Sequence, residues 1–188
     1  MNNPVPRRII LGPGPSSAHP RVLRAMSSPV MGYLDKDFFS ILEEVSMMLS
    51  DLYNTKQNSF AIGGTGSAGM EAGFISLAEP QDEVLICSNG YFCQRMANMT
   101  TRLNLNFSTL DFKWGTAVDL NVLEDKLKNS NIKLVAAIHA ETSTGVLNPI
   151  KDIGDLCKKY GAKFMVDCVT SLGAVSYTHL TLPTTPYV

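Results

Sequence analysis

Two kinds of hydrophobic pattern alternate along the chain from about residue 59 onward. In one kind, apolar residues recur three and four positions apart, which is typical of helices with one buried face. In the other, a short run such as 134–138 is apolar at every position, as in strands that helices cover on both sides. The predicted elements are, in order, strand 59–62, helix 67–78, strand 83–87, helix 92–103, strand 105–110, helix 120–129, strand 133–138, helix 149–160 and strand 162–166. This alternation predicts an α/β fold, with a mainly parallel sheet and helices on both of its faces.

The chain before residue 59 has a different character. Glycine and proline alternate over residues 12–15 after an apolar run, so residues 1–16 are predicted to form an extended N-terminal arm. A short helix over 20–26 and an amphipathic helix over 35–53 are predicted to follow. We therefore expect one domain over residues 17–175.

The last thirteen residues, 176–188, break the alternating pattern. They contain two prolines, four threonines and no charged residue apart from a possible His179, where another helix and strand would be due. Either the chain ends in an irregular tail, or its native sequence stops near Val175 and the remainder is a translation or assembly artefact. We favour the artefact.

Composition narrows the classes of function. The 188 residues are 45% hydrophobic and 18% charged with a net charge of −1, which is typical of a soluble globular domain and gives no nucleic-acid or membrane-surface footprint. No apolar run approaches membrane-spanning length. The four cysteines form no C-x-x-C pair and predict reduced thiols, so we expect a cytoplasmic protein without a metal site.

A glycine-rich turn between the first predicted strand and helix is the leading candidate for an anion site. Its N–H groups and the hydroxyls of Thr65 and Ser67, with Gly66 between them, would form a cup for phosphate at a helix start. The segment 64–69 also fits the dinucleotide pattern G-x-G-x-x-G. That interpretation needs an acidic residue after the second strand, where Ser88 and Asn89 stand instead.

Chemically useful residues follow the other strands as well. In a parallel sheet they share one edge with the glycine turn, because ligands bind outside the carboxyl ends of the strands. Phe92 could stack on a flat ring and Asp167 could pair with a protonated ring nitrogen, which together with a phosphate cup suits pyridoxal phosphate. We assign no catalytic role to His139 and interpret Cys93 and Cys168 as packing residues.

Several motifs occur in an order that is similar to one known family. They are Leu11-Gly12-Pro13-Gly14-Pro15-Ser16, Gly64-Thr65-Gly66-Ser67 with Met70-Glu71-Ala72, Ser88-Asn89-Gly90 with Gln94-Arg95, Glu141-Thr142-Ser143-Thr144-Gly145-Val146, and Val166-Asp167-Cys168-Val169-Thr170-Ser171-Leu172-Gly173. On these motifs the chain resembles the class V, fold-type I aminotransferases, nearest the alanine–glyoxylate and serine–glyoxylate (serine–pyruvate) group. The resemblance covers nearly all of residues 9–175.

The resemblance implies a role for particular residues. Thr65, Gly66 and Ser67 would bind the cofactor phosphate, and Phe92 would stack on its ring. Thr142 would contact the phenolic oxygen, Val169 would pack on the ring, and Asp167 would be the catalytic partner of the pyridinium nitrogen. Gly12, Pro13 and Gly14 would line the substrate pocket. Members of the family are homodimers with sites at the interface.

The implied reaction is pyridoxal-phosphate-dependent transamination between alanine or serine and a 2-oxo acid such as glyoxylate or pyruvate. Alternatives are a 2-aminoethylphosphonate–pyruvate transaminase or another class V enzyme, a non-catalytic fragment, and a nucleotide-binding α/β domain. The family's Schiff-base lysine and carboxylate-binding arginine, with the C-terminal small domain, would lie beyond the aspartate, and no lysine in this sequence stands in an equivalent place. We expect the chain as printed to carry part of an active site and to be inactive.

Overall fold

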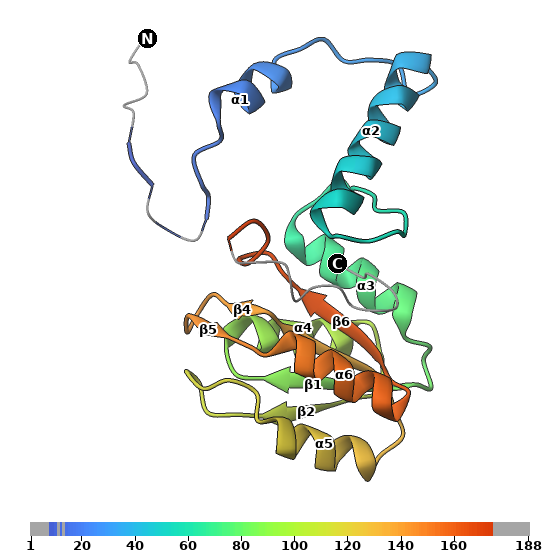
Figure 1. Ribbon diagram of the computed structural model, residues 1–188, viewed down its shortest axis with the longest axis vertical. Helices are drawn as coiled ribbons and strands as arrows, with labels where there is room; N and C mark the ends of the chain where they lie inside the picture. The colour runs from blue at the N-terminus through green and yellow to red at the C-terminus, as the bar shows by residue number, and fades with distance from the viewer. Residues whose placement is uncertain (1–7, 11, 13, 175–188) are drawn as a thin grey trace. The chain divides into compact units, whose positions relative to one another are not determined.

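The computed structural model describes residues 8–10, 12 and 14–174 (Figure 1). The chain forms two compact units, Met1–Glu43 and Glu44–Val188, whose boundary falls inside a helix. The predicted tail 176–188 and the end of the predicted domain at Val175 lie outside the described residues. The same holds for the first seven residues of the predicted arm, and for Leu11 and Pro13.

The first unit carries α1 (Pro20–Met26) and the beginning of α2 (Lys36–Leu52). Both helices start where the sequence supplies a cap: the His19 side chain accepts from the Arg21 N–H, and Asp35 accepts from the Asp37 N–H. Neither helix contains a buried residue. The two predicted helices are confirmed, and the longer one begins one residue later than expected because Asp35 caps it.

A four-stranded parallel sheet forms the centre of the second unit, with the order β2 (Phe107–Asp111), β1 (Glu83–Ser88), β3 (Ile132–Ile138) and β6 (Lys163–Asp167). The chain leaves β1 toward β2 and then crosses back to β3, so the direction of winding reverses between β1 and β3. Ligands of open α/β sheets bind at such a switch point, outside the carboxyl ends of the strands.

Helices cover both faces of this sheet (Figure 1). α3 (Gly66–Leu77) and α4 (Tyr91–Arg102) share one buried cluster with Val84, Ile86 and Leu134. α5 (Leu120–Lys128) and α6 (Ile150–Tyr160) share the other with Leu85 and Val135. Successive strand residues thus point to opposite clusters, which explains why the strands are apolar at every position. The predicted α/β fold is confirmed.

The predicted strand 59–62 is wrong within the described residues. Its backbone joins no strand ladder there, and Phe60 and Ile62 are exposed. A strand needs a neighbour for its hydrogen bonds, and local apolar character does not supply one. The structure also adds a small antiparallel hairpin, β4 (Ala140–Glu141) and β5 (Val146–Leu147), which the sequence pattern did not predict because each strand has only two residues.

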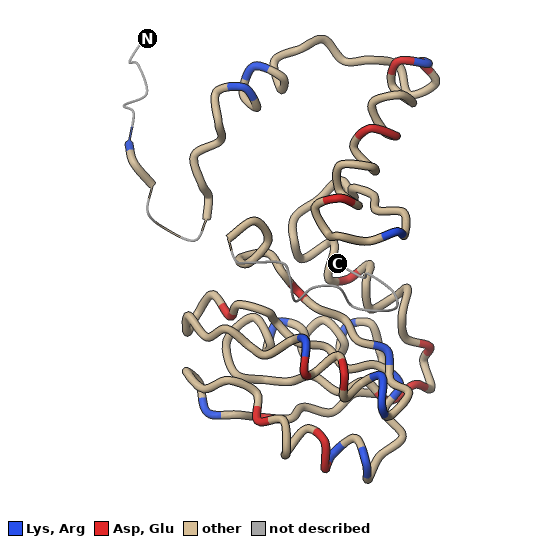
Figure 2. The backbone as a smooth tube through the Cα atoms, viewed as in Figure 1, with Lys and Arg blue, Asp and Glu red and all other residues tan. Residues whose placement is uncertain are grey.

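The charged residues of the second unit are mixed in sign. Both lysines and acidic residues occur along α5 and along α6 (Figure 2). Among the described residues no helix has the length and apolar character needed to cross a membrane. The same residues contain no group of three or more His, Cys, Asp or Glu side chains placed to hold a metal ion.

Candidate functional site

The start of α3 presents free N–H groups. Thr65 is the N-cap residue, but its side chain makes no capping hydrogen bond, and the N–H groups of Ala68 and Gly69 both donate to the Thr65 carbonyl oxygen at 2.9 and 3.3 Å. Within the described residues, no hydrogen bond uses the N–H groups of Gly66 and Ser67. These two donors lie at the positive end of a twelve-residue helix, which is a favourable place for an anion.

Gly66 lets this helix start come close to the loop after β6. A Cβ atom on Gly66 would lie 2.8 Å from Cγ2 of Val169, well inside van der Waals contact. Val169 itself is largely exposed. The glycine turn and the segment after β6, which are a hundred residues apart in sequence, therefore meet in the fold.

Asp167 ends β6 at the carboxyl edge of the sheet. Its Oδ1 accepts from the Val169 N–H at 2.9 Å, and the side chain is half-buried. Burial raises the pKa of the Asp167 carboxyl above its ordinary value; the Val169 hydrogen bond opposes that rise, and the negative charge of Glu141 adds to it. A cationic partner at this carboxylate would lower the pKa again.

A cavity of about 160 Å³ lies between α3 and the segment after β6. Gly66, Asp167 and Val169 all line it, so three of the predicted site residues surround one space. The remaining lining residues are Tyr53, Gly69, Met70, Met165, Cys168 and Leu172. The wall is mainly apolar with one carboxylate, which suits an aromatic ring that carries a cationic nitrogen.

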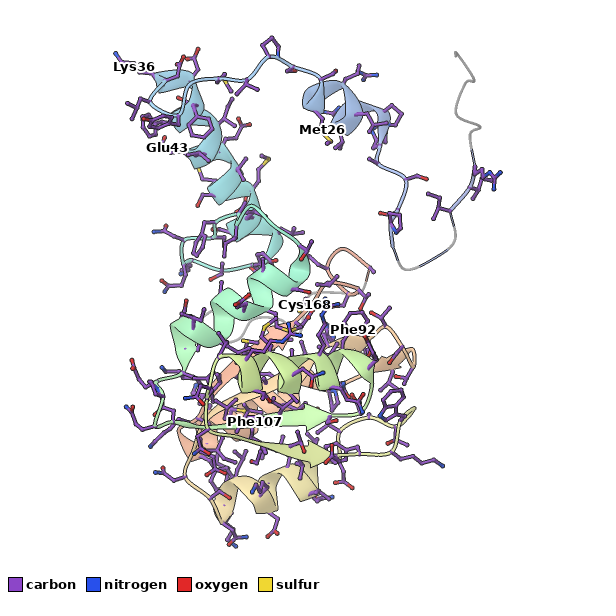
Figure 3. The ribbon with its side chains drawn as sticks, turned by 180° about the vertical axis from the view of Figure 1, so that it is seen from behind. Met26, Lys36, Glu43, Phe92, Phe107 and Cys168 are labelled. Carbon is purple, nitrogen blue, oxygen red and sulfur yellow. The ribbon has the colours of Figure 1, made fainter. Side chains whose placement is uncertain are left out.

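Phe92 stands in the first turn of α4 at the same edge of the sheet; Figure 3 shows it with Cys168, which follows β6. Its ring is half-buried and meets the Tyr91 ring edge-on, with the centroids 5.5 Å apart. The Phe92 N–H donates to Glu141 Oε1 at 3.4 Å, and the Tyr91 N–H donates to Ser143 Oγ at 3.0 Å. The start of α4 is thus attached to the β4–β5 turn.

Thr142 lies on that turn between Glu141 and Ser143, and it is half-buried. The turn is placed beside Asp167 by the pairing of Ile138 with Asp167 and by the His139 N–H, which donates to the Asp167 carbonyl oxygen at 2.8 Å. The Thr170 hydroxyl donates to the Ala140 carbonyl oxygen from the other side. Phe92, Thr142 and Asp167 therefore belong to adjoining strand ends.

The other predicted residues divide into two groups. Thr65 and Ser67 flank Gly66 at the start of α3, where Thr65 is exposed and Ser67 half-buried. Gly12 and Gly14 belong to the first unit, and Pro13 lies outside the described residues, so the substrate-pocket role of all three stays a prediction.

Sequence reasoning missed what Glu141 does. Its carboxyl group is fully buried and accepts hydrogen bonds from α4 and from Ser143. An acidic residue three positions after a buried strand was the available signal, because a carboxyl at such a place must find donors.

The lysines with described contacts do not line this cavity. Lys163 starts β6 at the opposite end of the sheet, and its Nζ donates to the Leu77 carbonyl oxygen at 2.7 Å. Lys151 and Lys159 pair with Asp155 and Glu124 on helix surfaces. That none of the three replaces a Schiff-base lysine stays a prediction.

The cysteines behave as packing residues, as predicted. Cys93 is fully buried, and burial raises its pKa to about 12; Cys168 is half-buried with a pKa raised to about 11, again mainly by burial. Both thiols stay protonated at neutral pH, which leaves them without nucleophilic character.

The fold is that of an α/β domain, and the candidate site lies at the carboxyl edge of its parallel sheet. The chain belongs to the class-V aminotransferase family, which matches residues 14–178. This confirms the family that the sequence motifs indicated.

The relatives of this chain include alanine–glyoxylate aminotransferases, which the sequence motifs indicated, and a ureidoglycine–glyoxylate transaminase, which they did not. The chain is 41% identical over 169 residues to the (S)-ureidoglycine–glyoxylate transaminase of Bacillus subtilis, covering 89% of this chain and 41% of the relative. It is 34% identical over 172 residues to the alanine–glyoxylate aminotransferase of Rattus norvegicus, covering 91% of this chain and 42% of that relative. The crystal structure of an alanine–glyoxylate aminotransferase from Nostoc sp. matches with a TM-score of 0.89 at 40% identity, covering 94% of this chain and 47% of that one. The chain thus spans less than half the length of these relatives.

Proposed function

We propose that the protein containing this chain is a pyridoxal 5'-phosphate-dependent aminotransferase, which moves an amino group between alanine or serine and a 2-oxo acid such as glyoxylate or pyruvate. Both named relatives carry glyoxylate in their names, and this favours glyoxylate as the acceptor. The identity of 41% to a ureidoglycine–glyoxylate transaminase makes (S)-ureidoglycine a second donor to test.

One observation carries the cofactor assignment: Gly66, whose N–H at the start of α3 is unused within the described residues, and Asp167 line the same cavity. The N–H groups of Gly66 and Ser67, with the hydroxyls of Thr65 and Ser67, would hold the phosphate. The carboxylate of Asp167 would pair with the protonated ring nitrogen, and burial strengthens that pairing. The donor set therefore fits the two charged ends of the cofactor.

The remaining residues would orient the ring. Phe92 offers an aromatic face from α4, and Val169 offers an apolar side chain from the segment after β6. Thr142 offers a hydroxyl for the phenolic oxygen. When bound, pyridoxal phosphate supplies an electron-withdrawing ring that stabilises the carbanion formed from an amino-acid substrate, and Asp167 maintains this property by keeping the ring nitrogen protonated.

Titration of the chain with pyridoxal phosphate tests the cofactor assignment. We expect saturable binding, seen as a change in the visible absorbance of the ligand, that inorganic phosphate competes away. NAD serves as the comparison ligand, because the segment 64–69 also fits the dinucleotide pattern. Tight NAD binding with no binding of pyridoxal phosphate would overturn the proposal.

Amino-group exchange by the full-length protein tests the substrates. Alanine, serine and (S)-ureidoglycine are offered as donors, each with glyoxylate or pyruvate. We expect turnover with glyoxylate and at least one of these donors. Activity confined to 2-aminoethylphosphonate with pyruvate would replace this assignment by the alternative from the same family.

We also infer a homodimer in the cytoplasm. The support for a dimer is the exposed apolar surface of the first unit and α2, whose helices bury no residue. The support for a reducing compartment is that all four cysteines are free thiols. Sedimentation of the full-length protein at several concentrations tests the dimer, and a monomer at all of them would contradict it.

A further inference from the structure

We propose that Glu141 is a positioning residue of the cofactor site, which fixes the start of α4 and thereby the ring of Phe92. The proposal rests on the proposed function, because it assigns Phe92 to the cofactor ring.

The Glu141 carboxyl is fully buried, and its described partners are hydrogen-bond donors without an ion pair. Oε1 accepts from the Ser143 hydroxyl at 2.8 Å, the Ser143 N–H at 3.1 Å and the Phe92 N–H at 3.4 Å, and Oε2 accepts from the Cys93 thiol at 3.4 Å. A buried carboxyl is costly unless such donors surround it. Its charge also lies at the positive end of α4, where a negative group is favoured.

Ser143 caps the N–H of Tyr91, the residue before Phe92. Its hydroxyl has one hydrogen, which it donates to Glu141, and the oxygen is then free to accept from the Tyr91 N–H at 3.0 Å. Glu141 thus sets the direction of the hydroxyl. Together the two side chains receive the N–H groups of the first two residues of α4.

Gly90 shows why the cap must come from a distant segment. It is the N-cap residue of α4, and glycine has no side chain with which to cap a helix. Its φ of −178° is extended backbone that any residue can adopt, so space is what requires glycine here. A Cβ atom would lie 2.3 Å from Cγ and 2.5 Å from Cδ of Glu141, and 2.8 Å from Ser143 Oγ. The carboxyl therefore packs directly against the Gly90 backbone.

These contacts couple two sides of the candidate site. Glu141 contacts the backbone of Phe92 on α4, and it directly precedes Thr142 on the β4–β5 turn. Loss of the carboxyl would release the first turn of α4 and the turn that carries Thr142 at once. The expected result is a misplaced aromatic ring in a domain that is otherwise folded.

The test compares Glu141→Ala, Glu141→Gln and Ser143→Ala with Glu79→Ala, a change at an exposed glutamate away from the site. The measurements are the amide exchange rates of Tyr91 and Phe92, the affinity for pyridoxal phosphate, and the visible circular dichroism of the bound ligand. Glu141→Ala is expected to raise the exchange rates of both amides and to weaken binding of pyridoxal phosphate by about tenfold. The dichroism band of the bound ligand should also change. Glu141→Gln keeps an acceptor oxygen and should restore the wild-type band and much of the affinity.

Ser143→Ala keeps the proposal falsifiable if Glu141→Ala fails to fold, because Ser143 is exposed and its loss removes only the hydroxyl that caps Tyr91 and donates to Glu141. It should raise the exchange rate of the Tyr91 amide and weaken binding of pyridoxal phosphate less than Glu141→Ala does. Wild-type affinity and dichroism in both variants would overturn the proposal. If the unmutated chain does not bind pyridoxal phosphate, the proposed function fails instead, and unchanged exchange rates would still overturn the positioning role by themselves.

Discussion

Gly66 and Val169 approach each other so closely that a single methyl group would not fit between them: a Cβ atom on Gly66 would lie 2.8 Å from Val169 Cγ2. Gly66 opens α3, and Val169 follows the strand that ends in Asp167. The contact therefore sets the separation between the proposed phosphate donors and the proposed partner of the ring nitrogen. A ligand that reaches both must match this separation.

Gly66→Ala is expected to weaken binding of pyridoxal phosphate by roughly tenfold, because the start of α3 or Val169 must move away to make room. The effect on folding should be small, since Val169 is exposed and can change its rotamer. Gly63→Ala is the matched control, because a Cβ atom there would meet no atom within 4 Å. Equal affinities of the two variants would contradict the importance of the close approach.

Asn148 holds together the loops at the switch point. Its side chain accepts from the Asn89 amide at 2.8 Å and the Val118 N–H at 3.0 Å, and donates to the Ile138 carbonyl oxygen at 2.8 Å. Asn148→Ala removes a partner from each of these buried groups, which is expected to lower the free energy of unfolding by about 3 kcal/mol. Urea denaturation measures the loss. Asn98→Ala, at an exposed position of α4, should change stability little; a similar loss there would show that the network is unimportant.

Most of the fold could be predicted from the sequence because it depends on local patterns. Helix α6 begins after Pro149 and ends at Gly161, which adopts the left-handed conformation with φ of 73°, as its signals indicate. The segment 59–62 is apolar in the same way as the predicted strands that do form, but it forms no strand among the described residues. Pairing requires a neighbouring strand, and the local pattern holds no information about that neighbour.

The candidate site was predictable where a topological rule applies and not where it depends on a distant contact. Asp167 and Phe92 could be placed because residues after parallel strands share one edge of a sheet. The capping of α4 by Glu141 could not be predicted. Glu141 and Phe92 are 49 residues apart in the sequence, and their contact depends on the space that Gly90 leaves. The spacing of residues along the sequence does not predict such close packing.

The thiols offer a test of burial that does not depend on the proposed function. Burial raises the pKa of Cys168 to about 11 and that of Cys93 to about 12, so little thiolate exists at neutral pH. Alkylation by iodoacetamide should be slow at pH 7 in the folded chain, should speed up as the pH rises, and should modify half-buried Cys168 before Cys93. Mass spectrometry of digested samples identifies the site, and urea-unfolded chain is the control. Rapid modification of Cys93 at pH 7 would contradict its burial.

Asp167→Asn is expected to weaken cofactor binding. The amide keeps an oxygen for the Val169 N–H but has no charge for a protonated ring nitrogen. Loss of a charged hydrogen-bond partner is expected to weaken binding of pyridoxal phosphate by about ten- to a hundredfold. Asp155→Asn on the surface of α6 is the control, because its only described partner is Lys151.

The same substitution should stabilise the empty chain in a pH-dependent way. Because the folded chain raises the Asp167 pKa above its ordinary value of 3.8, it holds this proton more tightly than the unfolded chain does. Stability of the unmutated chain therefore falls as the pH rises from that value through the folded pKa, and the penalty remains at higher pH. Asp167→Asn has no such penalty, so its advantage in free energy of unfolding should be absent at low pH and present at pH 7. Denaturation at several pH values measures this difference. An Asn variant that is less stable than the unmutated chain at pH 7 would mean that Asp167 serves the fold, whereas greater stability with weaker binding would be the signature of a carboxylate kept for its ligand.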